Sequence, residues 1–188
     1  GRIGIAFERH RFFQQRVQEE NTTLDKLLEL KGTSLEMFTV DYTYWDEMVR
    51  CIREKDLAWA DENIAEALGT YQAQVAWVYR SDRSLVYSAR DEEEKSLAGF
   101  DLPDDALAQL KSEGRFWHFF VQSPAGPIEI RAATVHPSSD PDRKTPPRGY
   151  FVVGRLWDQA YVTELAHLTG ARMQLGPKAA DVASRVSG

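Results

Sequence analysis

The run Asp41-Tyr42-Thr43-Tyr44-Trp45-Asp46 places two acids among three aromatic residues. A carboxylate in such surroundings can bind a ligand amine through an ion pair. It can equally serve the fold, because a carboxylate on an apolar surface needs a hydrogen-bonding partner within the protein. Which of the two applies depends on the element that carries the run.

The apolar spacing around this run predicts one helix from about Ser34 to Arg53. Its buried stripe follows alternating steps of three and four residues: Leu35, Phe38, Tyr42, Trp45, Val49 and Ile52. A second apolar row contains Met37, Tyr44 and Met48. Asp41 lies between the two rows, so we expect it to be buried with a dedicated partner. Asp46 lies at the polar edge of the same helix.

These positions lead to structural roles for three residues of the run. A carboxylate held by an indole, a tyrosine, an arginine or backbone amides is the simpler interpretation of Asp41, and contact with a ligand stays open. Trp45 is expected to pack in the core, because large aromatic residues at stripe spacing usually do so. For Asp46, a bond to a neighbouring loop, local capping and plain solvation remain open.

The rest of the chain predicts an α+β fold. Apolar residues in a broken heptad over residues 1–33 predict a long helix that extends as an arm or pairs with another chain. Strands are predicted at 74–80, 84–88, 115–122, 127–135, 149–156 and 171–175. Hairpins link most of them, which is typical of an antiparallel sheet, here of about five or six strands. Residues 136–147 have the composition of an exposed loop.

Composition and spacing give little support to catalysis. The net charge of −6 argues against a nucleic-acid partner. The four histidines share no metal-ligand spacing, and neither a Gly-x-Ser-x-Gly turn nor a phosphate-binding glycine loop occurs. The single cysteine, Cys51, lies beside the apolar stripe and fits a packing role. We therefore predict no catalytic residues, no metal and no cofactor.

Several segments together resemble a known family. The run at residues 41–46 resembles the Asp-x-x-x-Trp-Asp motif near the start of CHASE sensory domains of the fourth type. The similarity continues through Ala76-Trp77-Val78-Tyr79, Leu85-Val86-Tyr87 and the glycine-bounded strand 149–155, and ends with residues 161–175. One difference is the hairpin turn, which carries Asp82-Arg83 where such sensors usually have a glycine.

The resemblance implies a PAS-like or Cache-like sensor that lies outside the cytoplasmic membrane, between two transmembrane helices of a receptor. The implied cytoplasmic outputs are histidine kinases and enzymes of cyclic di-GMP metabolism. One side of a Cache-like sheet faces a ligand pocket, which makes Trp77, Tyr79, His118 and Arg131 candidate ligand contacts. For Arg131, a salt bridge with Asp41 is the structural alternative. The ligand itself is not implied.

The resulting domain prediction has three parts. Residues 1–33 form a signalling and homodimerisation helix, residues 34–176 form the sensory core, and residues 177–188 form a tail toward a membrane segment. Two other functions remain open. One is a constitutive dimerisation or protein-interaction module without a small ligand, and the other is a cytosolic enzyme with a non-contiguous site.

Overall fold

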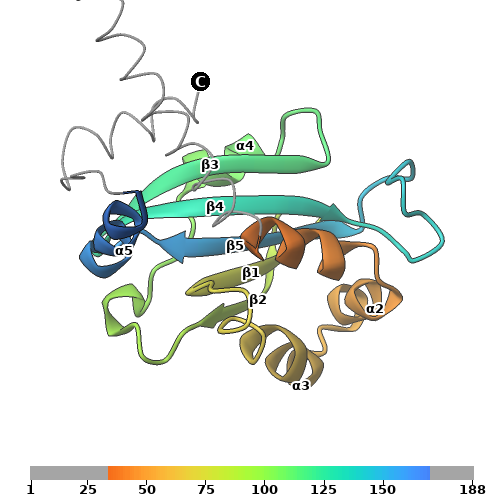
Figure 1. Ribbon diagram of the computed structural model, residues 1–188. Helices are drawn as coiled ribbons and strands as arrows, with labels where there is room; N and C mark the ends of the chain where they lie inside the picture. Colours follow the sequence, from red (N-terminus) through yellow and green to blue (C-terminus); the bar gives the residue numbers. More distant parts are fainter. Residues whose placement is uncertain (1–33, 170–188) are drawn as a thin grey trace, which may run out of the picture.

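The computed structural model describes residues 34–169, which form a five-stranded antiparallel sheet flanked by helical elements (Figure 1). The strands are β1 (Val75–Arg80), β2 (Leu85–Arg90), β3 (Phe116–Ser123), β4 (Gly126–Val135) and β5 (Gly149–Leu156). Their order in the sheet is β2-β1-β5-β4-β3. The predicted α+β class is thereby confirmed. The predicted helix over 1–33, the strand at 171–175 and the tail lie outside the described residues.

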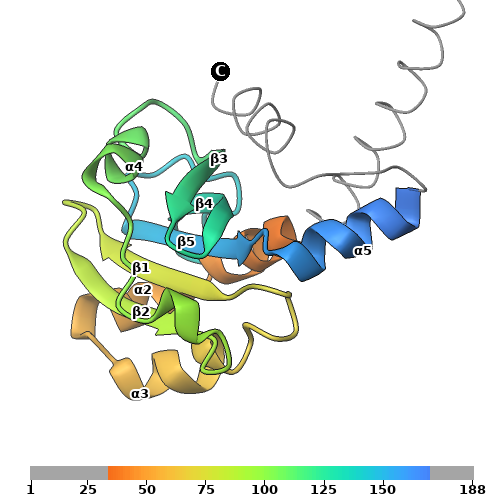
Figure 2. The same cartoon turned by 90° about the vertical axis from the view of Figure 1, so that its left-hand side faces the viewer.

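Helical elements cover both faces of the sheet (Figures 1 and 2). On one face, here called the helical face, the helical segment 34–43 packs with α2 (Asp46–Glu54), α3 (Leu57–Ala60) and the π-helical turn η1 (Asp61–Ala65). The opposite α4 face is covered by the short 3-10 turn η2 (Lys95–Leu97) and α4 (Asp104–Gln109). The last described helix, α5 (Gln159–Thr169), extends away from the sheet at the end of β5 (Figure 2).

The central strand β5 is buried along its whole length. It pairs with β1 on one side and with β4 on the other. Its alternate residues enter the two apolar clusters, Phe151 and Val153 on the helical face, Tyr150 and Val152 on the α4 face. A strand without a solvated face has no polar alternation, as the sequence predicted for residues 149–156.

The helix predicted from Ser34 to Arg53 is wrong in one respect, because it breaks at Tyr44 and Trp45. Trp45 has an extended backbone (φ −142°, ψ 122°), and Tyr44 forms an isolated β-bridge with His136. The carbonyl of Thr43 accepts a hydrogen bond from the backbone N–H of His136 (2.7 Å). That carbonyl is thus bound to the loop after β4, which stops the helix and starts α2 in a new direction.

The loop after β4 is also more buried than its composition predicts. His136, Asp140 and Arg143 are all buried. The Asp140 carboxylate accepts the backbone N–H groups of Lys144 and Thr145, each at 2.9 Å. Bonds from the Thr145 hydroxyl and from these two amides hold the pKa of Asp140 well below its usual value. The loop is therefore a structural part of the core that anchors the end of the segment 34–43.

The first hairpin turns where the sequence predicts it. Asp82 accepts the backbone N–H of Ser84 (2.8 Å), and Arg83 takes a left-handed conformation with φ 71°. That conformation is the one a glycine would supply without steric cost. Arg83 therefore adopts the geometry of the missing glycine at some backbone strain, and the hairpin of β1 and β2 is kept.

Candidate functional site

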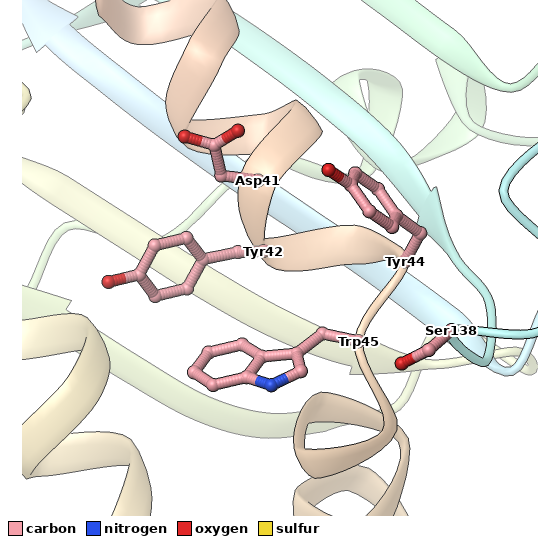
Figure 3. A pocket seen from close by; sticks show the side chains of 5 residues that line it. All are labelled: Asp41, Tyr42, Tyr44, Trp45 and Ser138. Atoms are coloured by element: carbon pink, nitrogen blue, oxygen red, sulfur yellow. The ribbon is translucent and has the colours of Figure 1, made fainter.

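The residues of the acid-and-aromatic run surround an open hollow at the end of the helical segment 34–43 (Figure 3). Its volume is about 390 Å³, and it is lined by Asp41, Tyr42, Tyr44, Trp45 and Ser138. In Figure 3, the rings of Tyr42 and Trp45 extend to the same side, whereas Tyr44 points back toward the side of Asp41. All but one of the lining residues thus come from the run itself.

A reciprocal hydrogen-bond pair fixes the turn that shapes this hollow. The Asp46 carboxylate accepts the backbone N–H of Ser138 (2.9 Å), and the Ser138 hydroxyl accepts the backbone N–H of Asp46 (3.2 Å). Asp46 begins α2, where an acid also interacts favourably with the helix dipole. Of the alternatives that the sequence left open for Asp46, the structure has the bond to a neighbouring loop.

Asp41 is exposed, so the expectation of a buried carboxylate is wrong. Two members of the second apolar row beside it do not face the core, because Met37 is 50% exposed and Tyr44 is 39% exposed, whereas Met48, beyond the break, is buried. Apolar residues on a surface are common, and a helical wheel does not separate them from core residues. Asp41 accepts a hydrogen bond from the Tyr71 hydroxyl (3.3 Å). Within the described residues, no arginine or lysine pairs with it.

The aromatic residues of the hollow also contact one another and the core. Trp45 is half-buried, and its ring lies edge-on to Trp59 (5.1 Å between centroids) and to Tyr42 (5.5 Å). Tyr42 in turn packs against Phe38 (4.9 Å). Burial, with smaller effects from Tyr71 and Asp41, raises the pKa of the Tyr42 hydroxyl, which therefore stays neutral. The rings form a packed edge of the core with one side open to solvent.

Two of the candidate ligand contacts, Trp77 and Tyr79, lie side by side on the α4 face. They are 1% and 4% exposed, within the cluster that η2 and α4 cover. The indole Nε1–H of Trp77 is buried and has no hydrogen-bond partner among the described residues. Burial, with a smaller effect from Asp101, raises the pKa of the Tyr79 hydroxyl. These two side chains thus present one unsatisfied donor within an otherwise apolar cluster.

The other two candidates, His118 and Arg131, lie on the opposite, helical face. They are direct partners across β3 and β4. His118 Nε2 lies 2.8 Å from a carboxylate oxygen of Glu129. The Nε of Arg131 is buried without a hydrogen-bond partner, and the described residues show no salt bridge between Arg131 and Asp41. The four candidates therefore do not form one site.

Arg155 is a buried polar centre that the sequence analysis missed. Its side chain is 1% exposed, and its Nε donates to the carbonyl of Gln72 (2.9 Å). Its Nη2 donates to the Ser34 hydroxyl (2.7 Å) and to the carbonyl of Tyr71 (3.2 Å). The guanidinium carbon also lies 5.7 Å from the centre of the Tyr161 ring in α5. A charge within a strand predicted to be buried was the signal that could have found it.

Glu129 adds a second buried charge near Arg155. It also accepts the indole N–H of Trp157 (3.3 Å). Burial would raise the pKa of Glu129, but the hydrogen bond from His118 and the charges of His118 and Arg155 hold it below its usual value. A hollow of about 280 Å³ opens beside Arg155, between the chain before β1 and the first turns of α5.

The described residues contain neither a cluster of metal ligands nor a reactive cysteine. No group of three or more potential ligands could hold a metal ion there. Cys51 is buried, and burial raises the pKa of its thiol to about 11. Between residues 34 and 169, no helix is both long and apolar enough to cross a membrane.

Comparison with known proteins gives two kinds of match. The sequence matches the family described as the CHASE4 domain over residues 27–176. Two solved structures of the periplasmic domain of Vibrio cholerae LuxQ have a similar fold, with TM-scores of 0.56 and 0.58 at 10% and 11% identity. Each match covers 81% of this chain, and 70% or 69% of the LuxQ domain. No curated protein matches the sequence.

The family match spans most of the chain, and the structure keeps the motifs on which the resemblance was based. The acid-and-aromatic run, the first hairpin and the glycine-bounded strand β5 all fall within residues 27–176. The likeness to LuxQ shows that the fold is one used by a periplasmic domain. The sequence expectation of an extracytoplasmic sensory domain is thereby supported, and the chain belongs to the CHASE4 domain family.

Proposed function

We propose that this chain is the signal-input domain of a transmembrane receptor, and that it binds a small molecule outside the cytoplasmic membrane. The binding would be relayed to a cytoplasmic histidine kinase or to an enzyme of cyclic di-GMP metabolism. Membership of the CHASE4 family supports the sensory role. Flanking transmembrane helices and a homodimer formed through residues 1–33 belong to the same proposal.

One observation carries the relay part of this proposal. Arg155 bonds to Ser34, where the described chain begins, and lies over Tyr161 in α5, the last described helix. Both ends of the sensory core thus contact one buried side chain. A ligand that prefers one of two packings of the core would shift their populations. A change in the packing around Arg155 would then move the two ends of the sensory core relative to each other.

Candidate ligand contacts remain those that the sequence indicated, now divided between two faces. Trp77 and Tyr79 would contact a ligand admitted beneath α4, where the free indole N–H of Trp77 could donate to an acceptor. Arg131, with His118 beside it, would suit a carboxylate on the helical face. A buried N–H group without a hydrogen-bond partner favours a ligand that supplies an acceptor, and each face of the sheet has one such group.

A thermal-shift screen of the 188-residue chain tests whether it binds a small molecule. Amino acids, small carboxylates and polyamines are the first classes to screen. A ligand at about one hundred times its Kd stabilises the folded state by about 2.7 kcal/mol, which a melting experiment detects. Stabilisation by one class supports the proposal. The variants Trp77→Phe and Arg131→Gln then assign the face, because each removes one unsatisfied donor.

The relay is tested in the full-length receptor with Arg155→Lys. Lysine keeps the charge but loses the planar fork that joins Ser34 and the carbonyls of Tyr71 and Gln72. We expect ligand binding to be retained and the output response to be lost. Arg90→Lys is the matched control, because Arg90 also donates to a backbone carbonyl, that of Phe100, but lies on β2 away from both chain ends. An unimpaired response in Arg155→Lys contradicts the relay.

The second candidate function is a constitutive dimerisation or interaction module. The close packing of Trp77 and Tyr79 favours it, because a filled α4 face leaves no room for a ligand without rearrangement. This function predicts no thermal stabilisation by any metabolite. It also predicts one oligomeric state at all ligand concentrations, which analytical ultracentrifugation measures.

A further inference from the structure

The two acids of the run have different surroundings. Asp46 has a structural role, because one oxygen of its carboxylate accepts the backbone N–H of Ser138 and its own N–H is bound in return. Asp41 has one hydrogen bond, a long one from the Tyr71 hydroxyl. Asp41 lines the hollow, and its side chain is exposed to solvent. The turn is thus held by Asp46, and the charge of Asp41 is left available.

The residues around Asp41 provide the surfaces that a cation prefers. Tyr42, Tyr44 and Trp45 line the same hollow, and the face of an aromatic ring attracts a positive charge. Ser138 adds a hydroxyl. Among the described side chains that line the hollow, Asp41 alone carries a charge, so the lining itself disfavours an anion, and the guanidinium carbon of Arg143 lies 5.9 Å from the centre of the Tyr44 ring. The chemistry of the hollow therefore favours a cation with an apolar part.

The hollow does not need a ligand to form. Tyr44 is fixed by its bridge to His136, and Arg143 lies over its ring at 5.9 Å. Trp45 is held against Trp59, and the Asp46–Ser138 pair closes the turn. A site that is ordered beforehand loses less conformational entropy on binding. Its volume of about 390 Å³ lies at the lower end of the range for small-molecule sites.

We propose that this hollow binds an organic cation, a primary or quaternary ammonium group, with Asp41 as the counter-ion. The rings of Tyr42, Tyr44 and Trp45 contact the carbon atoms next to the charge. This inference rests on the proposed function, since it names a ligand class and a site for the sensor. It also gives the motif a role in recognition, whereas the sequence alone favoured a structural role for Asp41.

The first experiment is isothermal titration of the 188-residue chain with choline and with its neutral isostere 3,3-dimethylbutan-1-ol. The two probes have the same shape and differ in charge. Choline is expected to bind with a Kd in the millimolar range, because the site is open to water. The alcohol is expected to bind at least about fivefold more weakly, the ratio that corresponds to about 1 kcal/mol. Propylammonium tests the primary class in the same way.

Two variants separate recognition from folding. Asp41→Asn removes the charge but keeps an oxygen that can accept the Tyr71 hydroxyl, so its unfolding midpoint should match that of the parent chain. Its affinity for choline should fall at least about fivefold. Glu36→Gln is the matched control, since Glu36 is exposed on the same helical segment but does not line the hollow. Its affinity should not change. Perturbation of the Trp45 indole N–H signal by choline in NMR spectra places the ligand in the hollow.

Three results would overturn the inference. The first is equal binding of choline and the alcohol, and the second is equal binding of choline to the parent chain and to Asp41→Asn. The third is stabilisation by a different class, such as carboxylates, with no binding of either cation at tens of millimolar. That third result leaves the proposed sensory function intact. Failure of every small molecule to bind contradicts the small-ligand part of both proposals.

Discussion

Replacing Gly149 by alanine tests why glycines bound the central strand β5. An added Cβ at Gly149 would press against the backbone carbonyl oxygen of Tyr79, well inside van der Waals distance, and would lie 2.8 Å from Cδ1 of Ile52. Tyr79 belongs to β1, which pairs directly with this end of β5. Because the obstacle is backbone, the methyl group fits only if the two strands separate.

The cost follows from what such a separation breaks. One or two hydrogen bonds of the β1–β5 ladder would lengthen, at about 1 kcal/mol each. Overpacking against Ile52 adds about 1 kcal/mol, the lower end for such changes. Lower backbone entropy of the unfolded alanine chain offsets roughly 0.5 kcal/mol. We therefore expect Gly149→Ala to lower the free energy of unfolding by about 2 kcal/mol, and Tm by roughly 4–8 °C for a chain of this size.

Two other glycines provide the comparison. At Gly154, the added methyl group meets only side-chain ends, with Cγ2 of Val75 at 2.6 Å and Cγ2 of Ile128 at 2.8 Å. Both atoms are branches on the Cβ of buried side chains and can yield only by small shifts in χ1, which cost less than separating two paired strands, so Gly154→Ala should cost about 1–1.5 kcal/mol. At Gly69, nothing lies within 4 Å, and Gly69→Ala should be neutral or slightly stabilising.

Urea unfolding followed by circular dichroism measures all three variants under the same conditions. The expected order of destabilisation is Gly149→Ala, then Gly154→Ala, then Gly69→Ala. The reasoning is refuted if Gly149→Ala unfolds at the same urea concentration as the parent chain. It is also refuted if Gly69→Ala is as costly as Gly149→Ala, because the close approach of a neighbouring strand could then not be the cause of the cost.

Three further predictions concern the loop after β4 and the core. Asp46→Ala and Ser138→Ala each remove one of the two side chain–backbone bonds of the reciprocal pair, so urea unfolding should show each variant destabilised by about 0.5–1.5 kcal/mol; a variant as stable as the parent chain would deny its bond a role in holding the turn. Burial and the charge of Arg143 lower the pKa of His136, so stability should fall as the pH drops below about 6.5, where the unfolded chain takes up the proton first. The slope of the unfolding free energy against pH, at most about 1.4 kcal/mol per pH unit, should be smaller in His136→Gln. An unchanged slope would mean that another titratable group causes it. Cys51, with its pKa raised to about 11, should react with a thiol reagent at pH 8 only after unfolding, and labelling of the native chain would contradict its burial.

Regular periodicity explains why the sheet could be predicted from the sequence. The strands around Trp77, His118 and Phe151 each lie within two residues of their predicted bounds. Residues that alternate or run as continuous apolar segments leave few alternatives, and hairpin turns fix the antiparallel pairing. The pairing order of the sheet does not follow from such local patterns, because it depends on contacts between distant strands.

Contacts between distant segments explain what the sequence analysis missed. The break at Tyr44 and Trp45 is imposed by His136, which lies about ninety residues further along the chain. A helical wheel holds only for a continuous helix that buries all its apolar rows. The predicted helix is broken, and its second apolar row is only partly buried. The predicted burial of Asp41 was wrong for the second of these two reasons. The loop residues Asp140 and Arg143 looked solvated because polar composition does not report hydrogen bonds to the loop's own backbone.

The buried charge with dedicated partners that the sequence analysis expected at Asp41 is found instead at Arg155. A charge inside an apolar environment needs a dedicated set of partners, and Arg155 has them in Ser34, Tyr71 and Gln72. Arg155 contacts both Ser34 and Tyr161, so the costly charge lies at the place through which we propose that the signal is transmitted. Asp41 is free of that structural duty. An exposed acid in an aromatic hollow costs the fold little, so Asp41 can serve the recognition of a cation that we propose without a loss of stability.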